Sequence, residues 1–395
     1  MLKTGQTDLP LHGGACPSWL FARMKELARA IVEVILEEHG PHEILRRLSH
    51  PYWFQSLGCV LGFDWHSSGL TTTVCAALKE GAGEVARQAG LFFAGGKGLT
   101  ARKTPQEIER TADLFGISSG ERLIYASRMA AKVDSAAVQD GFELYHHFFV
   151  YTDQGDWAVI QQGMNEELKT ARRYHWLSLT LKDFTLEPHQ AVCCDVTTET
   201  LNLVSPLNLA LREGALEISR LSPDVTWGEL KALTESSLYL SLPLAHAIPK
   251  SSSINKALRA LYESQAQDFE SLLNISGVGA GTLRALCLVA EVTFGVKASY
   301  SDPVRYSFAH GGKDGHPFYV NTTDMEISYN TLRRAVKRAK LQDKTMLEAL
   351  RRLALWHQEA ASVRATPDIK EKTLPRKRPL LQAGQLSLFP ELEEK

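Results

Sequence analysis

The sequence predicts an α+β protein with a helical N-terminal part, a small β-containing central region and a helical C-terminal domain. Three observations predict this class. Apolar residues recur at a helical period in residues 1–130 and again in 225–360, whereas residues 140–200 hold β-rich runs around polar turns. The chain has 395 residues, 44% of them hydrophobic, which is enough for two or three domains with a buried core.

The N-terminal part is expected to be mostly helical. Ser18 is a candidate N-cap for a helix whose apolar residues recur at positions 20, 24, 27, 31, 34 and 35, and Gly40-Pro41 ends it. Glycines divide the next segment into turns, with a helix expected from Thr72. The stretch FFAGGKGLTARKTPQEIER predicts a glycine turn followed by a helix led by Thr104-Pro105.

The central region predicts strands. FELYHHFFVYTDQGDWAVIQQGM contains two β-rich runs on either side of the polar turn Asp153–Asp156, a pattern typical of a hairpin. The segments HWLSLTLKDFTL and AVCCDVTTETLNLV are candidates for further strands.

Composition divides the chain into four units. Residues 1–205 form the expected N-terminal α+β domain, and residues 206–358 form the expected helical C-terminal domain. Residues 359–384 are charged, contain proline and lack aromatic side chains, so we expect a disordered linker. A short apolar motif, residues 385–389, follows that linker.

Charge and cysteine usage limit the class of protein. With 44 Lys and Arg against 45 Asp and Glu, any basic surface must be local. The 6 cysteines include no CxxC pair, which predicts buried thiols in a reducing, cytoplasmic compartment. No apolar run is long enough to span a bilayer, so we expect no membrane contact.

Residues 272–295, LLNISGVGAGTLRALCLVAEVTFG, contain the strongest motif of the folded part. A helix, a glycine turn and a second helix follow one another, and the pattern resembles the helix-hairpin-helix module. The resemblance implies that backbone N–H groups at the start of the second helix bind a DNA phosphate regardless of sequence. The alternative is a tight turn without a ligand. The predicted DNA-binding residues here are Gly277, Val278, Gly279, Gly281 and Thr282.

A basic segment follows in TLRRAVKRAKLQDKTMLEALRRL. Lysine and arginine occupy eight of its positions and acids only two. Arg333, Arg334 and Lys337 are candidates for a second phosphate-binding surface, and the alternative is an ordinary solvated helix face.

Polar residues that suit catalysis gather in residues 132–175. If 142–151 is a strand, Glu143 and His147 share one face, and with Asp140 they form a candidate Mn²⁺ or Mg²⁺ site. A bound divalent ion would activate water for phosphodiester cleavage. The alternative is a set of hydrogen-bonded structural residues. The candidate catalytic residues are Asp134, Glu143, His147, Arg172, Arg173 and His175.

Three further candidates stay open as alternatives. Asp302 lies about 25 residues after Gly277, which is similar to the place of the catalytic aspartate in helix-hairpin-helix glycosylases. That resemblance implies base excision without a Schiff-base lysine, because Gly281 stands where lyase-active members carry lysine. The simpler interpretation is that Asp302 caps a turn with Pro303. FDWHSSG and the glycine-flanked Lys97 are the other candidates.

Four strings together carry a family resemblance: TDLPLHGG (7–14), GCVLGFDWHSSGLTTTVCAALKEG (58–81), QQGMN with ARRYHW (161–176), and SFAHGGKDGHPF (307–318). They resemble a prokaryotic family known as domain of unknown function 763, over about residues 1–355. The resemblance implies no mechanism.

The terminal motif QLSLF resembles the peptide by which bacterial repair and replication proteins bind the sliding clamp. Leu386, Leu388 and Phe389 would fill apolar pockets while Gln385 hydrogen-bonds at the rim. The alternative is a tail that folds back on its own protein.

We therefore expect a DNA-binding protein of repair or replication, with RNA left open as the substrate. The leading hypothesis is a metal-dependent nuclease recruited to the clamp. The alternatives are a glycosylase-like base-excision enzyme and a clamp-tethered adaptor without catalysis.

Overall fold

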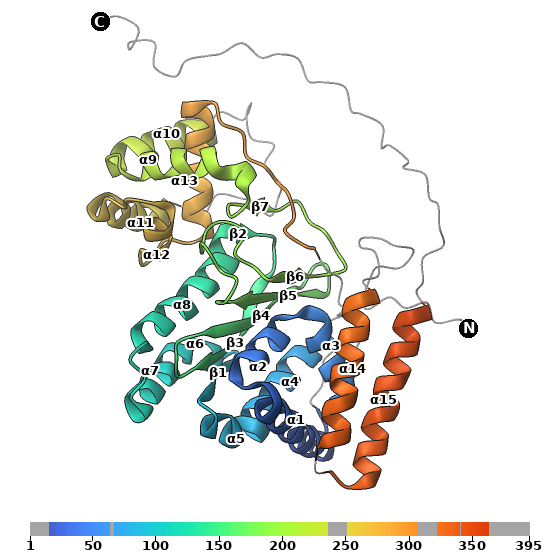
Figure 1. Cartoon of the computed structure of the whole chain (residues 1–395). Helices are drawn as coiled ribbons and strands as arrows, with labels where there is room; N and C mark the ends of the chain where they lie inside the picture. Colours follow the sequence, from blue (N-terminus) through green and yellow to red (C-terminus); the bar gives the residue numbers. More distant parts are fainter. Residues whose placement is uncertain (1–15, 64–66, 236–250, 306–321, 340, 363–395) are drawn as a thin grey trace, which may run out of the picture.

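The computed structural model describes residues 16–63, 67–235, 251–305, 322–339 and 341–362. At its centre lies an antiparallel five-stranded sheet with strand order β1-β3-β4-β5-β6 (Figure 1). Its strands are β1 (Leu91–Lys97), β3 (Glu143–Thr152), β4 (Trp157–Asn165), β5 (Thr170–Leu177) and β6 (Ala191–Cys193). A separate pair joins β2 (Val138–Gln139) to β7 (Leu201–Asn202). The predicted α+β class and the predicted hairpin around Asp153–Asp156 are confirmed.

Strand β1 was not predicted, because its glycines indicated a turn. The backbone of Gly95 has φ +84°, and a Cβ there would lie 2.2 Å from the carbonyl oxygen of His147 and 2.6 Å from the hydroxyl oxygen of Thr104. Glycine therefore lets β1 run close to both β3 and the start of the next long helix. The prediction of a turn was wrong, because these glycines allow neighbouring backbone segments to pack closely and do not end the strand.

One group of helices comes from the N-terminal part. They are α1 (Ser18–His39), α2 (Pro41–Ser49), α3 (Pro51–Leu61), α4 (Gly69–Ala77) and α5 (Gly83–Gln88), with the π-helical turn η1 (Leu78–Ala82). The predicted cap at Ser18 is wrong, since Pro17 occupies the N-cap and Ser18 is the first helical residue. Helix α4 begins three residues before the expected Thr72.

Helices from the middle of the chain form a second group, of which α6, α7 and α8 contact the five-stranded sheet and α9 to α13 lie beyond one end of it (Figure 1). They are α6 (Leu99–Arg102), α7 (Thr104–Phe115), α8 (Gly120–Lys132), α9 (Leu209–Ser219), α10 (Pro223–Glu235), α11 (Ser251–Ser264), α12 (Phe269–Asn274) and α13 (Ala280–Phe294). Helix α8 continues into the π-helical turn η2 (Val133–Ala137), and a 3-10 turn, η3 (Pro206–Asn208), precedes α9.

The strands alternate between two hydrophobic cores. Phe149 and Tyr151 point into a core shared with α8, α9 and α13, whereas Phe148 and Val150 point into a core shared with α1, α3 and α4. This is the two-residue period expected of a strand that is buried on both faces.

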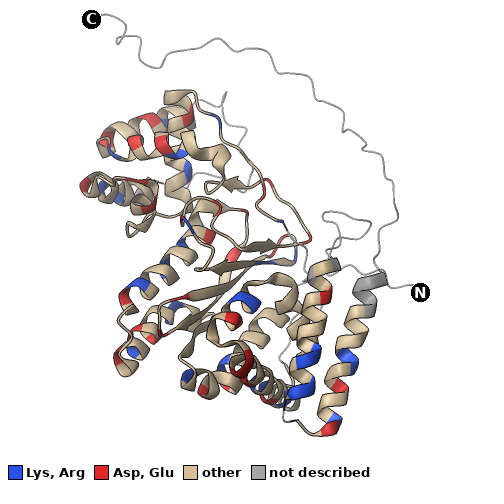
Figure 2. Ribbon diagram, viewed as in Figure 1, with Lys and Arg blue, Asp and Glu red and all other residues tan. Residues whose placement is uncertain are grey.

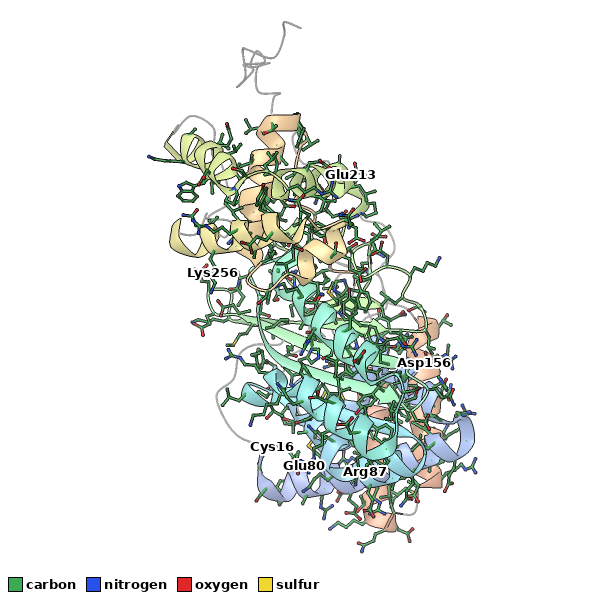
Figure 3. All side chains as sticks on the ribbon, turned by 90° about the vertical axis from the view of Figure 1, so that its left-hand side faces the viewer. Cys16, Glu80, Arg87, Asp156, Glu213 and Lys256 are labelled. Atoms are coloured by element: carbon green, nitrogen blue, oxygen red, sulfur yellow. The ribbon has the colours of Figure 1, made fainter. Side chains whose placement is uncertain are left out.

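The last two helices belong to the core shared with α1, α3 and α4, called the second core below; the core shared with α8, α9 and α13 is called the first. Helices α14 (Thr322–Arg338) and α15 (Asp343–Ser362) pack on α1 and α3, far from α9–α13 (Figure 1). The unit expected at 206–358 is therefore divided between the two cores. Figure 3 shows the same arrangement from the side, with Glu213 and Lys256 at one end and Cys16, Glu80 and Arg87 at the other. Among the helices in the described ranges, none is both long and apolar enough to cross a membrane.

Candidate functional site

A cavity of about 540 Å³ lies between the sheet and helices α6 and α8. Its volume is within the range of small-molecule sites in proteins. Strands β3 and β4 supply its floor, and the N-terminal end of α7 borders it through Pro105. The polar side chains that line it are Arg102, Ser127, Arg128, Ser135, Tyr145, His146, His147 and Gln161.

A chain of hydrogen bonds beside the cavity links α8, β3, β4 and the π-helical turn η2. The hydroxyl oxygen of Ser127 lies 2.9 Å from His147 Nε2, and His147 Nδ1 lies 2.8 Å from Gln161 Oε1. Gln161 Nε2 donates to Asp134 Oδ2 at 2.5 Å and to the carbonyl oxygen of Ala130 at 3.1 Å. Because a carbonyl oxygen only accepts, the Gln161 amide has one possible orientation, with Oε1 facing His147.

This orientation fixes the tautomer of His147. Gln161 Oε1 is an acceptor, so Nδ1 of His147 carries the proton and donates to it. Nε2 is then unprotonated and accepts from the Ser127 hydroxyl. Burial lowers the pKa of His147, against the opposing effects of Gln161 and Asp134, so the ring is neutral at neutral pH.

Asp134 anchors this array from within the protein. It lies in the π-helical turn η2, and its side chain is fully buried. In addition to Gln161, its carboxylate contacts Trp176 Nε1 at 2.9 Å and His189 Nε2 at 2.5 Å. Asp134 therefore orients Gln161 and does not reach the cavity surface itself.

His146 also lines the cavity but takes no part in this array. Both of its ring nitrogens are buried and have no hydrogen-bond partner among the described residues. Burial, together with the neighbouring His147 and Lys97, lowers its pKa to about 3. The ring is therefore neutral, and it stacks on Phe148 with ring centroids 6.4 Å apart.

The predicted metal ligands are not brought together. A β-bulge at Tyr145 separates the pair Leu144–Gly163 from the pair His146–Gln162. Glu143 faces Met164 across the strands and His147 faces Gln161, and these two partners lie three residues apart. Residues paired across strands share a face, so Glu143 and His147 lie on opposite faces of the sheet.

Asp140, the third predicted ligand, is occupied elsewhere. Its Oδ2 accepts from Arg172 at 2.9 Å and from the hydroxyl of Tyr174 at 2.5 Å, and its Oδ1 accepts from the Phe142 amide at 3.0 Å. Within the described part of the chain, His, Cys, Asp and Glu form no group of three or more that could hold a metal ion.

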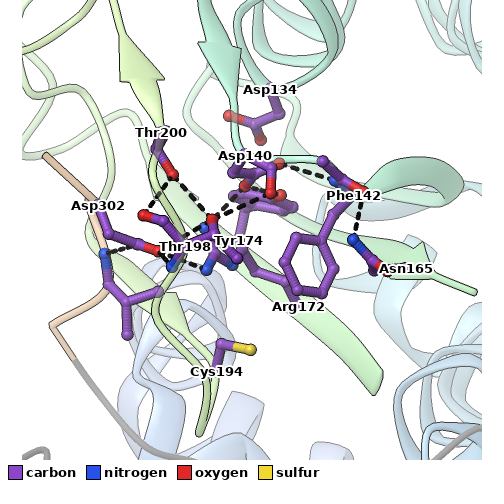
Figure 4. Close-up of polar contacts among 12 residues, drawn as sticks. Asp134, Asp140, Phe142, Asn165, Arg172, Tyr174, Cys194, Thr198, Thr200 and Asp302 are labelled. Atoms are coloured by element: carbon purple, nitrogen blue, oxygen red, sulfur yellow. Dashed lines mark hydrogen bonds and ion pairs between the residues drawn. The ribbon is translucent and has the colours of Figure 1, made fainter. Parts of the chain in front are cut away.

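Arg172 is held between two carboxylates on this face of the sheet (Figure 4). Its second amino group donates to Asp302 Oδ2 at 2.7 Å and to the Val196 carbonyl at 3.1 Å. Burial opposes its charge, but Asp140 and Asp302 raise its pKa above the ordinary value. The side chain is 0% exposed and therefore does not face a bound phosphate.

Asp302 is likewise a structural carboxylate in this arrangement. Its Oδ2 accepts from the Thr198 amide at 2.6 Å as well as from Arg172, and its Oδ1 accepts from the Val304 amide at 2.9 Å. The bond to Val304 is the turn that the simpler sequence interpretation expected. Both carboxylate oxygens of Asp302 are thus hydrogen-bonded, and the bond to Arg172 connects the segment after α13 to β5.

Arg173 and His175 point to the other face of β5. Arg173 Nε donates to His175 Nε2 at 2.9 Å, and its amino group donates to Gln55 Oε1 at 3.1 Å. His175 Nε2 is the acceptor, so its Nδ1 donates to the Leu48 carbonyl at 3.1 Å. The prediction that Arg172, Arg173 and His175 face one phosphate is wrong, because alternate residues of a strand point to opposite faces.

Helices α12 and α13 are joined by a short turn, Ile275–Gly279, at one end of the first core. Asp268 and Ser271 form a capping box at the start of α12, and Val278 is 1% exposed between the two helices. Gly277 has φ +85°, and a Cβ at Gly277 or Gly279 would meet no atom within 4 Å. The turn is therefore open on its outer side. Thr282, in contrast, is buried in the core, and Gly281 is half-buried.

A second cavity, of about 420 Å³, lies between this turn and the first cavity. Ala280 and Arg284 of α13 line it together with Gln139 and Glu143. Gln139 Nε2 donates to the Ala280 carbonyl at 3.0 Å, which fixes the start of α13 against β2. Both cavities are lined by Ser135 and Leu144, so they adjoin one another.

The basic residues of α14 lie on a different side of the molecule. Arg333, Arg334 and Lys337 are exposed on α14, which packs in the second core (Figure 2). On the same helices Arg338 pairs with Glu38, and Arg352 donates to the Val60 carbonyl at 2.8 Å. The basic face is therefore not continuous with the α12–α13 turn.

Several predicted residues lie outside the described ranges. The linker beyond residue 362 and the whole terminal motif belong to this group, as do Asp64 and His66 of FDWHSSG. The clamp-binding candidates concerned are Gln385, Leu386, Leu388 and Phe389.

The sequence analysis missed the partners of the predicted residues. Ser127 sits on a helix that looks ordinary in sequence, and Gln161, Trp176 and His189 were not singled out. One signal was available, because Gln161 and Gln162 follow a run of four apolar residues in one strand, and a buried amide requires partners.

The chain is an α+β protein with helices on both faces of a central antiparallel sheet. A buried array of Ser127, His147, Gln161 and Asp134 lies beside a cavity on one of these faces. The family model described as "Protein of unknown function (DUF763)" matches residues 5–320. The chain belongs to this family, as the sequence resemblance predicted. No curated protein and no solved structure matched the chain.

Proposed function

We propose that this chain is a DNA-binding protein of DNA repair or replication, which contacts DNA phosphates at the α12–α13 turn and reaches the sliding clamp through its C-terminal motif. The observation that carries the proposal is the open turn Ile275–Gly279 at the start of α13. Gly277 and Gly279 have free space on their outer side, so a second backbone can come close to them.

The start of α13 suits an anion for two reasons. The first backbone hydrogen bond of α13 runs from the Leu283 amide to the Gly279 carbonyl at 3.0 Å. The amides that precede Leu283 in the first turn therefore have no acceptor within the helix. The helix dipole adds a partial positive charge at the same place. Arg284, one turn further along α13, lines the adjoining cavity and adds a cation.

A charge reversal at the turn tests the phosphate contact. Gly279→Asp places a carboxylate at this position, where a Cβ meets no atom within 4 Å, so the fold should tolerate it. We expect the affinity for duplex DNA to fall roughly tenfold, about 1.4 kcal/mol, for unrelated sequences alike. Fluorescence anisotropy with labelled duplex DNA, single-stranded DNA and RNA measures the change and the preferred polymer.

Gly279→Asn is the matched control, since it has the same shape without the charge. Its affinity should stay within a few-fold of the wild type. Equal affinity of the Asp variant and the wild type would leave the turn as a purely structural connection.

The C-terminal motif is tested separately. Replacing Leu388 and Phe389 by Ala removes the two side chains that would fill the clamp pocket, so clamp binding should weaken by at least 100-fold. DNA affinity should not change. Surface plasmon resonance on an immobilised bacterial clamp is the measurement, with Ser387→Ala as the matched control. A full-strength clamp complex of the double variant would contradict the proposal.

Of the functions that the sequence suggested, the geometry favours clamp-tethered DNA binding over both the predicted metal-dependent nuclease site and the predicted glycosylase site. The metal-dependent nuclease needs ligands that Asp140, Glu143 and His147 do not supply together. The glycosylase needs a free Asp302, whose oxygens are taken by Arg172 and two backbone amides. Incubation of end-labelled DNA and RNA with Mn²⁺, Mg²⁺ or EDTA decides the nuclease question, because metal-dependent cleavage would require ligands other than these.

A further inference from the structure

The hydroxyl group of Ser127 is arranged as a nucleophile beside a base. Ser127 is in the middle of α8 and lines the 540 Å³ cavity, together with His147 and Gln161. A serine inside a helix commonly donates to a carbonyl one turn back, but the bond recorded for this hydroxyl runs to His147 Nε2 at 2.9 Å. Because Nε2 is unprotonated, it accepts the hydroxyl proton, and the oxygen keeps both lone pairs for a substrate.

The array meets the geometric requirements of nucleophilic catalysis. A nucleophile, a base within hydrogen-bond distance and a third group that orients the base are all present in Ser127, His147 and Gln161. Asp134 holds Gln161 in place from the π-helical turn η2, and such turns are frequent at functional sites.

The lining of the cavity indicates the charge of its ligand. Arg102 of α6 and Arg128 of α8 line it, and both side chains are exposed. Neither has an ion-pair partner among the described residues, and the lining contains no Asp or Glu. An anionic group is the ligand that this combination favours, and the planar guanidinium groups suit phosphate oxygens in particular.

We propose that Ser127 and His147 form a metal-independent phosphodiesterase site, with Ser127 as the nucleophile and His147 as the general base. This goes beyond the proposed function, because the chemistry takes place in the cavity and does not depend on the α12–α13 turn. Arg102 and Arg128 bind the non-bridging oxygens of the phosphodiester and stabilise the charge that develops on them.

The reaction proceeds in two balanced steps. In the first, Ser127 Oγ forms a bond to phosphorus while its proton moves to His147 Nε2; the bond to one ester oxygen breaks, and that alcohol leaves with the proton. In the second, water loses a proton to His147 Nε2 and bonds to phosphorus; the bond to Ser127 Oγ breaks and the serine regains the proton. The products are a phosphomonoester and an alcohol, and no oxidant or metal is consumed.

Covalent labelling of the full chain in EDTA tests the nucleophile directly. An alkyl fluorophosphonate should form an ester with Ser127 and release fluoride, and peptide mass spectrometry locates the adduct. Ser127→Ala should remove the label completely, and His147→Asn should slow labelling by at least 100-fold. Ser135→Ala is the matched control, because Ser135 lines the same cavity without touching a histidine, and it should label like the wild type.

Turnover of bis(4-nitrophenyl) phosphate in EDTA tests the complete reaction. Release of 4-nitrophenolate should be lost in Ser127→Ala and His147→Asn and kept in Ser135→Ala. Gly279→Asp should keep it as well, which separates this proposal from DNA binding at the turn. A wild-type protein that neither labels at Ser127 nor turns over the diester would overturn the proposal, and so would labelling that survives Ser127→Ala.

Discussion

Two neighbouring arginines, Arg172 and Arg173, are both fully buried but in different chemical surroundings. Arg172 lies between the carboxylates of Asp140 and Asp302, which raise its pKa. Arg173 has neutral acceptors and the ring of Phe54 at 4.6 Å, and burial lowers its pKa to about 10. A buried guanidinium is costly to desolvate, so each depends on its full set of partners.

Removing one partner of Arg172 should therefore be costly. Asp140→Ala leaves the guanidinium half-paired and the Tyr174 hydroxyl without its 2.5 Å acceptor. We expect the free energy of unfolding to fall by about 3–5 kcal/mol, measured by urea denaturation. Asp113→Ala, an exposed change on α7, is the control and should stay within about 0.5 kcal/mol. A similarly small effect at Asp140 would mean that Asp302 alone satisfies Arg172.

Single residues were the part of the site that the sequence predicted least well. It indicated that His147 and Asp134 are important, and the structure places both in one hydrogen-bonded array. It could not indicate Ser127 or Gln161 as their partners, because these contacts join a helix to a strand 20 and 27 residues away. Such pairings depend on tertiary packing, which a single sequence does not reveal.

At the scale of elements, the β-bulge at Tyr145 decides which side chains meet. The extra residue shifts the alternation of β3, so that Glu143 and Leu144 point to the faces opposite to those expected from a regular strand. Glu143 therefore does not share a face with His147. Strand periodicity predicted β3, β4 and the hairpin turn, but a bulge leaves no signal in the pattern of FELYHHFF. The missed strand β1 has a related cause, since its glycines serve close packing.

Helix α15 is expected to be an integral part of the second core. Leu353 is 0% exposed there, whereas Leu347 on the same helix is 62% exposed. Leu353→Ala should lower the free energy of unfolding by about 2–5 kcal/mol, and Leu347→Ala should change it by no more than about 0.5 kcal/mol. Thermal unfolding monitored by circular dichroism compares the two. Equal effects would show that α15 is only loosely attached.

At the scale of the whole molecule, buried histidines couple stability to pH. Burial lowers the pKa of His146 to about 3, and it also lowers the pKa values of His147 and His175. In the unfolded chain these rings titrate near pH 6.5. The unfolded state therefore binds more protons below that pH, so acid favours unfolding and stability increases with pH in this window.

We expect the urea midpoint to fall progressively as the pH is lowered from about 6.5 toward 3. Each histidine contributes up to about 1.4 kcal/mol per pH unit below its unfolded pKa. The variant His146→Leu cannot take up this proton, so its stability should depend less steeply on pH than that of the wild type. An unchanged slope would exclude His146 as a source of the acid sensitivity.

The alternation along β5 also restricts the alternatives open to the folding chain. A slip of β5 by one residue that puts Arg173 in the place of Arg172 would keep the charge there, since both residues are arginine. It would, however, bring Tyr174 and Trp176 to the places of Arg173 and His175 in the second core, and His175 to the place of Tyr174 beside Asp140. These exchanges mismatch side-chain size and hydrogen-bonding groups on both faces at once. Because β5 contacts both cores, a wrong register of this one strand is disfavoured by the helices on each face of the sheet.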